Sequence, residues 1–398
     1  MSRRRALLLS AAVLPLATPA LARERRPAAA ARPAAPTGTP ASTPLGPFDT
    51  IARQALIIDA ETDAVLLEKH ADERMAPSSM LKLMTLYIIF DMLKRGRLQL
   101  KQELPISERA WKMQGSKMFV QIGTQVPVEA LLRGVIVQSG NDATVALAEG
   151  VAGSEAQFVE LMAAKARELG MKDSTFRNAT GWPDPEQRMS SRDLAKLARR
   201  LIIDFPEYYP MFNERSFTWN GITQENRNTM LTRVPGGDGL KTGHTEEAGF
   251  GVVASAKRGN RRLIMVVNGL PSMKARGEEG ERLLEWGFRE FDNITLFKAG
   301  EVIEEVPVYL GTRPGVPLVG GRDVIVTVPR NWQETMQAKL RYKAPIPAPV
   351  LKGQELGRLE ISGRGVPNLS LPLLAGADVE KRGMLGRIPA VIGGFLGS

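Results

Sequence analysis

Hydrophobic and polar positions follow a strand-like pattern at both ends of the segment between about residues 50 and 291, and a helical period in its middle. Residues 55–59 and 64–68 are short apolar runs joined by a turn, and residues 249–256 and 262–270 form a second such pair. Because strands from both ends of a segment can pair into one antiparallel sheet, the pattern predicts an α+β domain with a sheet flanked by helices. Spacings of three and four residues predict helices over about 79–94, 128–137, 142–151, 155–169, 191–203 and 275–291.

The pattern changes after Asn293. Short alternating segments separated by Gly and Pro turns are typical of an all-β module, and we predict a small β-sandwich over residues 293–378. Its strands are expected at about 302–310, 323–328, 338–342 and 354–361. Residues 48–292 then form the first domain, and residues 293–378 form the second.

The N-terminus has the layout of a secretory signal peptide over residues 1–22. Three arginines precede a short apolar run, and Ala20-Leu21-Ala22 offers an A-x-A cleavage site. An uncleaved anchor is the alternative, although the apolar run is short for a membrane span. Residues 23–47 are rich in Pro and Ala and predict an extended, disordered tether. We therefore expect a protein exported to the bacterial envelope.

The C-terminal tail, residues 379–398, places apolar side chains on one face of a possible helix. These recur at steps of three and four, at Met384, Leu385, Ile388, Val391, Ile392, Phe395 and Leu396. With basic residues at its start, the segment 381–398 is interpreted as a peripheral anchor on the periplasmic surface of the inner membrane. A helix packed on the β module or a frayed end is the alternative, because Pro389 and several glycines weaken the helix.

Composition narrows the classes of chemistry. The chain has 398 residues, no cysteine and only two histidines, His70 and His244, far apart in sequence. A thiolate site, a His-based metal cluster and a Ser-His-Asp triad are therefore poorly supported. The net charge of +10 falls to +7 without the three signal-peptide arginines. A basic exported protein is expected to contact anionic lipid or cell-wall polymer. No motif for nucleic-acid binding is present. Alternatively, the basic side chains simply form a solvated surface.

Ser79 and Lys82 form an S-x-x-K motif at the start of a predicted helix, with Ser78 as its expected cap. An offset of three residues puts both side chains on one helix face. A lysine whose pKa is lowered by burial or by nearby positive charge can accept the serine proton. The helix N-terminus favours the developing alkoxide. An isolated match is weak, because about one is expected by chance in a chain of this length.

Two further motifs follow in order. In Ser139-Gly140-Asn141 (S-x-N), Ser139 can relay a proton between Lys82 and a leaving amine, and Asn141 can hold a substrate amide. Alternatively, the pair caps a helix at Asp142. Lys241-Thr242-Gly243 (K-T-G) is expected to start an inner strand, where Lys and Thr bind a carboxylate and Gly admits the substrate backbone. A solvent-facing turn is the alternative, but the ordered triplet is typical of penicillin-recognising enzymes.

With these motifs the chain resembles a low-molecular-mass penicillin-binding protein of the serine D-alanyl-D-alanine carboxypeptidase family. The similarity covers about residues 50–380 and includes the phrases Pro77–Lys82, Gln138–Ala143 and Asp238–Thr245. S-G-N is the usual middle motif of this family, whereas many serine β-lactamases have S-D-N. The resemblance implies a transpeptidase/β-lactamase-like catalytic domain with a helical subdomain, a C-terminal β domain and an amphipathic anchor.

The resemblance also implies residue roles. Ser79 is expected to be acylated by the penultimate D-Ala carbonyl of peptidoglycan stem peptides, with release of the terminal D-Ala, and β-lactams are expected to acylate the same serine. The backbone N–H groups of Ser79 and His244 would form the oxyanion hole. Arg276 would bind the terminal carboxylate, unless it is a surface arginine. The implied catalytic residues are Ser79, Lys82, Ser139, Asn141 and Lys241, and the implied substrate-binding residues are Thr242, Gly243, His244 and Arg276. No cofactor or metal is implied.

Three alternative functions are weighed against these residues. Many β-lactamases carry a deacylating glutamate four residues before an asparagine, whereas this chain has Ser174 before Asn178. We therefore expect slow hydrolysis of β-lactams and a long-lived penicilloyl adduct on Ser79. A DD-endopeptidase would cut crosslinks with the same site. A non-catalytic wall-binding scaffold would not need all five catalytic residues, so their presence argues against it.

Overall fold

The structure, a computed structural model, describes residues 39–383. The predicted signal peptide, most of the predicted tether, and residues 384–398 of the predicted tail lie outside the described residues. Between residues 39 and 383, the structure has no helix long and apolar enough to cross a membrane.

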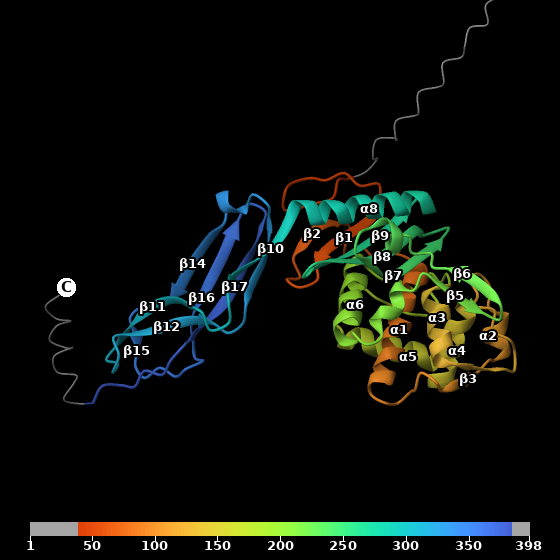
Figure 1. The fold of residues 1–398 in the computed structure, drawn as a ribbon, viewed down its shortest axis with the longest axis horizontal. Coiled ribbons are helices and arrows are strands. Elements are labelled where there is room, and N and C mark those ends of the chain that lie inside the picture. The colour runs from red at the N-terminus through yellow and green to blue at the C-terminus, as the bar shows by residue number, and fades with distance from the viewer. Residues whose placement is uncertain (1–38, 384–398) are drawn as a thin grey trace, which may run out of the picture. The chain divides into compact units, whose positions relative to one another are not determined.

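A five-stranded antiparallel sheet brings together strands from both ends of the first domain, with the order β2-β1-β9-β8-β7 (Figure 1). Its strands are β1 (Gln54–Asp59), β2 (Val65–Lys69), β7 (Gly237–Thr245), β8 (Gly249–Arg258) and β9 (Arg261–Leu270). Ile57 of β1 pairs with Met265 of β9, which joins the two predicted hairpins into one sheet. The expected α+β arrangement is confirmed.

Both faces of this sheet are covered. Alternate side chains enter different clusters: Leu56 and Ile58 lie in one, and Ile57 lies in the other. The first cluster includes residues of α1 (Lys82–Lys94) and α6 (Ser191–Asp204), and the second includes residues of α8 (Met273–Glu290). Figure 1 shows α8 along one face of the sheet and α6 near the other. Burial on both sides explains why the middle of β1, residues 55–58, is apolar without alternation.

Helices fill the sequence between the two parts of the sheet. Helix α1 is buried around nearly its whole circumference, and Phe90 is among the largest fully buried side chains. The other helices here are α2 (Glu108–Lys112), α3 (Val128–Ile136), α4 (Asn141–Ala152), α5 (Glu155–Glu168) and α7 (Met230–Arg233). Two small hairpins, β3 (Glu103–Pro105) with β4 (Gln125–Pro127) and β5 (Ser216–Trp219) with β6 (Ile222–Glu225), complete this region.

The C-terminal unit is all β, as predicted. Strand β10 (Phe291–Phe297) pairs with β13 (Val324–Pro329). A six-stranded sheet has the order β14-β16-β17-β12-β11-β15, and both sheets contribute to one apolar cluster. The strands of the larger sheet are β11 (Val302–Tyr309), β12 (Gly315–Gly320), β14 (Gln337–Tyr342), β15 (Ile346–Pro347), β16 (Glu355–Gly363) and β17 (Val366–Ala375).

Some sequence predictions need correction. Strands β10, β12 and β17 were not predicted; β17 is interrupted by prolines, which weaken a strand signal. The end of the tether was placed too late, because Ala41 is buried and its backbone pairs with that of Phe48, while Ser42 pairs with Glu68 of β2. Short apolar residues among prolines thus extend the ordered domain N-terminally.

Candidate active site

Ser79 lies in a short 3-10 helix, η1 (Ser78–Leu81), which runs directly into α1 at Lys82. The predicted α-helical turn capped by Ser78 is wrong: Ser78 has a φ of 45° and its hydroxyl donates to the carbonyl of Pro77, at 2.8 Å. In a 3-10 helix, side chains three residues apart are eclipsed. The Lys82 amine therefore lies 2.9 Å from the Ser79 hydroxyl oxygen.

Lys82 is fully buried, and each of its polar neighbours accepts a hydrogen bond. Besides Ser79, its amine donates to the side-chain oxygen of Asn141 at 2.8 Å and to the backbone carbonyl of Thr180 at 2.6 Å. Burial, and then the positive charge of Arg227, lower the pKa of Lys82 to about 7, while Asp142 opposes the shift. A neutral amine has two N–H bonds and one lone pair. Since Asn141 and Thr180 take both N–H bonds, the lone pair is left for the proton of Ser79.

The S-x-N motif brings Asn141 to Lys82, and neither of its polar side chains caps a helix. Helix α4 has Gly140 at its N-cap, without a side-chain cap. The amide of Asn141 is held from both ends, because its oxygen accepts from Lys82 and its nitrogen donates to the Gln114 carbonyl at 2.7 Å. Ser139 has a φ of 59°, and its buried hydroxyl has no hydrogen-bond partner among the described residues. A strained residue with a free hydroxyl is a frequent feature of functional sites.

Asp142 fixes the loop beside the S-x-N motif. Its carboxylate accepts backbone N–H groups from Met118 and Phe119 at 2.8 Å each, and from Val120 at 3.3 Å. A Cβ at Gly140 would lie 2.9 Å from an Asp142 carboxylate oxygen and 3.1 Å from the Met118 nitrogen. The glycine in the middle motif is thus required by the close approach of this loop.

The K-T-G motif lies within β7, which is an edge strand of the five-stranded sheet and not an inner one. Lys241 and Thr242 are buried, which excludes a solvent-facing turn. A Cβ at Gly243 would lie 2.1 Å from the Ser78 hydroxyl oxygen, so a larger residue would push β7 away from η1. This contact brings K-T-G beside S-x-x-K.

A cluster of cations lies around Ser79. Burial, and then the charges of Lys82, Arg227 and Arg276, lower the pKa of Lys241 well below its usual value. Arg276, in the first turn of α8, is only 3% exposed and donates to the Arg227 carbonyl at 3.1 Å, so it is not a surface arginine. Burial and the charge of Arg227 lower its pKa to about 10. Such a cluster suits an anionic group of a ligand.

Arg227 is the member of this cluster that sequence reasoning missed. It precedes α7 and its guanidinium donates to the Ser116 hydroxyl at 2.5 Å. Its charge acts on Lys82, Lys241 and Arg276. No motif or spacing in the sequence singles out this arginine, because the fold brings it to the site from a loop.

Two further residues contribute differently from the motif residues. The exposed His244 ring stacks on Phe250, with ring centroids 3.9 Å apart. Ser174 donates to the carboxylate of Asp193 at 2.8 Å. Between residues 39 and 383, no carboxylate hydrogen-bonds to Ser79 or Lys82. In the same range there is no group of three or more His, Asp or Glu side chains that could hold a metal ion.

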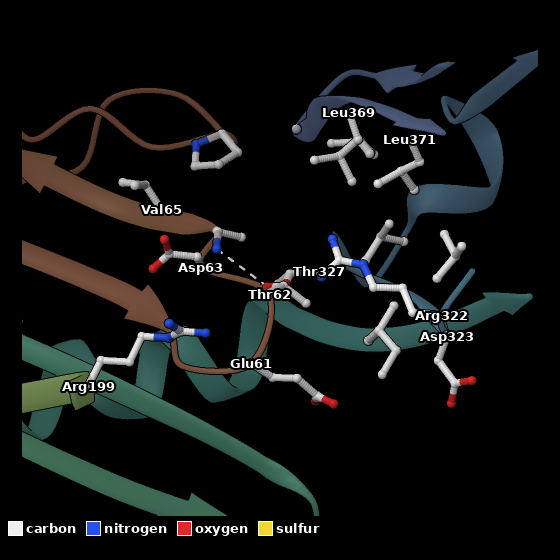
Figure 2. Close-up of a pocket in the computed structure, with 17 residues that line it drawn as sticks. Glu61, Thr62, Asp63, Val65, Arg199, Arg322, Asp323, Thr327, Leu369 and Leu371 are labelled. Atoms are coloured by element: carbon white, nitrogen blue, oxygen red, sulfur yellow. Dashed lines mark hydrogen bonds between the residues drawn. The ribbon is translucent and has the colours of Figure 1, made fainter. Parts of the chain in front are cut away.

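A cavity of about 790 Å³ lies elsewhere in the molecule (Figure 2). It is lined by the turn between β1 and β2, by Arg199 of α6, and by strands β13 and β17. Thr62 and Thr327, which both line it, have hydroxyl oxygens 2.5 Å apart. None of the motif residues lines this cavity, so its size does not identify it as the active site.

Comparisons with known proteins agree with this arrangement. A family model described as D-alanyl-D-alanine carboxypeptidase matches residues 39–272, and one described as the C-terminal domain of penicillin-binding protein 5 matches residues 291–381. The chain is 38% identical to D-alanyl-D-alanine carboxypeptidase DacA of Haemophilus influenzae, covering 86% of this chain and 88% of that protein. It is also 38% identical to DacC of Escherichia coli, covering 89% and 90%. The crystal structure of penicillin-binding protein 5 from Haemophilus influenzae matches with a TM-score of 0.77 and 38% identity, over 84% of this chain and 99% of that one.

Proposed function

This chain belongs to the D-alanyl-D-alanine carboxypeptidase family of serine peptidases, and from that premise we propose that Ser79 is the residue acylated by the substrate. The observation that carries the proposal is the pairing of Ser79 with a fully buried lysine 2.9 Å away whose other two polar contacts are both acceptors. The enzyme is a hydrolase, and the substrate is a peptidoglycan stem peptide that ends in D-Ala-D-Ala.

Acylation begins with transfer of the Ser79 proton to neutral Lys82. The serine oxygen attacks the penultimate D-Ala carbonyl, and the backbone N–H groups of Ser79 and His244 stabilise the oxyanion, at roughly 3 kcal/mol for each donor. The proton then passes from Lys82 through the Ser139 hydroxyl to the nitrogen of the departing D-Ala. The unpartnered Ser139 hydroxyl supports this route. Water, deprotonated by Lys82, then attacks the acyl carbonyl, the bond to the Ser79 oxygen breaks, and Lys82 returns the proton to that oxygen as the shortened peptide leaves.

The terminal carboxylate of the substrate is bound by the cation cluster. Lys241 and Arg276 supply positive charge, and Thr242 supplies a hydroxyl. Burial, and then the repulsion of neighbouring cations, lower the pKa values of Lys241 and Arg276, and a bound anion offsets that repulsion. Strand β7 is an edge strand, and an extended peptide can add to such an edge through backbone hydrogen bonds.

β-Lactams are covalent inhibitors in this account. They carry a carboxylate and a strained amide, so they use the same cations and the same serine. Ser174 stands where a deacylating glutamate would be, and it is bound to Asp193 instead of facing Ser79. Slow hydrolysis of the penicilloyl adduct follows, which disfavours a β-lactamase.

The relatives favour trimming over crosslink cleavage, because those that match over most of this chain are D-alanyl-D-alanine carboxypeptidases. The buried Arg276 suits a free carboxylate next to the scissile bond, which a terminal D-Ala provides.

We place the catalytic domain at residues 41–292, the β-sandwich domain at 293–381 and the peripheral anchor in the tail beyond it, because Ala41 pairs with Phe48 and Lys381 pairs with Gly311. The relatives are bacterial enzymes, which agrees with export. The signal-like residues 1–22 and the basic, amphipathic pattern of 381–398 support a location on the periplasmic face of the inner membrane.

Release of D-Ala from a pentapeptide muropeptide tests the proposed function. The wild-type enzyme should release one D-Ala per peptide and leave a tetrapeptide, whereas Ser79→Ala and Lys82→Ala should be inactive. Cleavage of crosslinked dimers without D-Ala release would identify an endopeptidase. Full activity of Ser79→Ala would exclude the mechanism.

A further inference from the structure

An exposed tryptophan lies beside the serine–lysine pair, and the mechanism above does not use it. Trp182 leaves 45% of its surface in contact with solvent. We propose that Trp182 is a specificity-determining residue: its indole forms the wall against which the aliphatic side chain of the residue preceding D-Ala-D-Ala packs. This inference rests on the proposed carboxypeptidase function.

The backbone next to Trp182 is pressed against the nucleophile. A Cβ at Gly181 would lie 1.9 Å from the carbonyl oxygen of Ser78 and 3.1 Å from the backbone nitrogen of Ser79. One residue earlier, the Thr180 carbonyl accepts a hydrogen bond from Lys82 at 2.6 Å. Trp182 therefore follows directly after two residues that touch the reacting pair.

The indole lies on the same side of the site as the Asn141 amide. A Cβ built on Gly115 would lie 3.1 Å from the Asn141 side-chain nitrogen and 3.2 Å from the six-membered ring of Trp182. The ring and the amide therefore both border Gly115, and the amide is itself bound to Lys82. A peptide bound at Ser79 is expected to pass this ring.

Hydrogen bonds hold the backbone of Trp182 in place while its ring stays exposed. Asn178 accepts from the backbone nitrogens of Gly181 at 2.8 Å and Trp182 at 3.0 Å. The carbonyl of Trp182 accepts from the side chains of Asn178 and Gln187, both at 3.0 Å. The loop is also tied to the turn after β7 by an ion pair of 3.0 Å between Arg188 and Glu247. An exposed aromatic ring on a fixed backbone is a preorganised contact.

The chemistry of the ring indicates the part of the substrate that it meets. The cations bind the terminal carboxylate, and Ser79 attacks the penultimate carbonyl, so the preceding residue extends from the site toward its rim. An indole face gains from covering methylene groups and peptide planes, and it has no charge with which to select a head group. A long aliphatic side chain is therefore expected to bind better than the hydrogen of glycine.

The test compares two substrates with three forms of the full chain. Diacetyl-L-Lys-D-Ala-D-Ala carries the aliphatic side chain, and acetyl-Gly-D-Ala-D-Ala lacks it. Trp182→Ala should lower kcat/KM for the lysine substrate about tenfold more than for the glycine substrate, the effect expected from one or two buried methylene groups. Trp182→Phe, the conservative control, should retain most of the preference. An equal fall on both substrates would overturn the inference.

A binding measurement separates this inference from the proposed function. In a Ser79→Ala background, the lysine substrate should change indole fluorescence, and this change should be lost in Ser79→Ala/Trp182→Phe. Trp182→Ala should still be acylated by 6-aminopenicillanic acid, which lacks an acyl side chain, and this acylation would show that Ser79 and Lys82 remain functional. If the wild type releases no D-Ala but the fluorescence change depends on Trp182, the proposed activity fails and the contact stands. If the change persists without Trp182, the contact fails.

Discussion

Acidification below neutral pH is expected to stop acylation of Ser79, because the base is a lysine that must be neutral. Burial lowers the pKa of Lys82 from the usual 10.5 to about 7. The neutral fraction is then about one half at pH 7, about one tenth at pH 6 and about one hundredth at pH 5. The second-order rate of acylation by a fluorescent penicillin should therefore fall about tenfold per pH unit below 7 and level off above about pH 8.

The sign of this effect follows from the direction of the shift. The folded protein binds the Lys82 proton less tightly than an exposed lysine does, so the reactive form predominates above the lowered pKa. A lysine with its ordinary pKa of 10.5 would instead give a rate that keeps rising to about pH 10. The rate is measured from pH 5 to 9 by rapid quenching and gel fluorescence.

Replacing Arg227 tests the physical cause of the shift. Its positive charge is the second cause that lowers the pKa of Lys82, after burial. Arg227→Gln should therefore move the acidic limb to higher pH, so that part of the rate lost at pH 7 returns at pH 9. Arg97→Gln is the matched control, because Arg97 is exposed and is not among these causes. A flat profile from pH 5 to 9 in the wild type, or an identical midpoint in both variants, would refute this reasoning.

Two more predictions concern the substrate pocket and the middle motif. Arg276→Ala should remove about 2–5 kcal/mol of binding to the terminal carboxylate. This loss should lower kcat/KM for D-Ala-D-Ala peptides at least about thirtyfold. Lys274→Ala, on the same helix but with a side chain that is 83% exposed, should have little effect. An equal loss on a substrate with an amidated C-terminus would contradict carboxylate binding. Gly140→Ala should destabilise the protein by about 1–3 kcal/mol and slow acylation, because the added methyl group would contact Asp142 and Met118. Gly383→Ala is the control, because a methyl group there would have no atom within 4 Å. Thermal unfolding checks this, and an unchanged Tm would contradict the close approach.

The three motifs and their order could be found in the sequence, and so could most strands of the main sheet. Strand-like runs at both ends of the first domain, such as 55–59 and 262–270, predicted one antiparallel sheet because they bracket a helical middle. The structure shows that these strands are buried on both faces. What the sequence did not reveal depends on contacts between distant segments. The 3-10 turn at Ser79 depends on packing against Gly181 and Gly243, which no local propensity encodes.

The same limit applies to individual site residues. Arg227 reaches the cation cluster from a loop and has no motif around it. The edge position of β7 follows from the sheet order, which a strand pattern alone does not fix. Strand β17 carries prolines, yet it pairs with β16 and β12, and its apolar residues enter the apolar cluster of the C-terminal unit. Local sequence patterns thus indicated the motif residues of the active site, whereas the topology of the fold determined which other residues lie beside them.

The central claim is that Ser79 is the acylated nucleophile, and the mass of the penicillin adduct tests it most directly. After incubation with benzylpenicillin, the intact protein should gain the mass of one penicilloyl group. Peptide mapping should place that group on the peptide that contains Ser79, and the adduct should outlast removal of free penicillin. Ser79→Ala should gain no mass under the same conditions. An adduct on another residue, or an equal gain of mass in Ser79→Ala, would contradict the account.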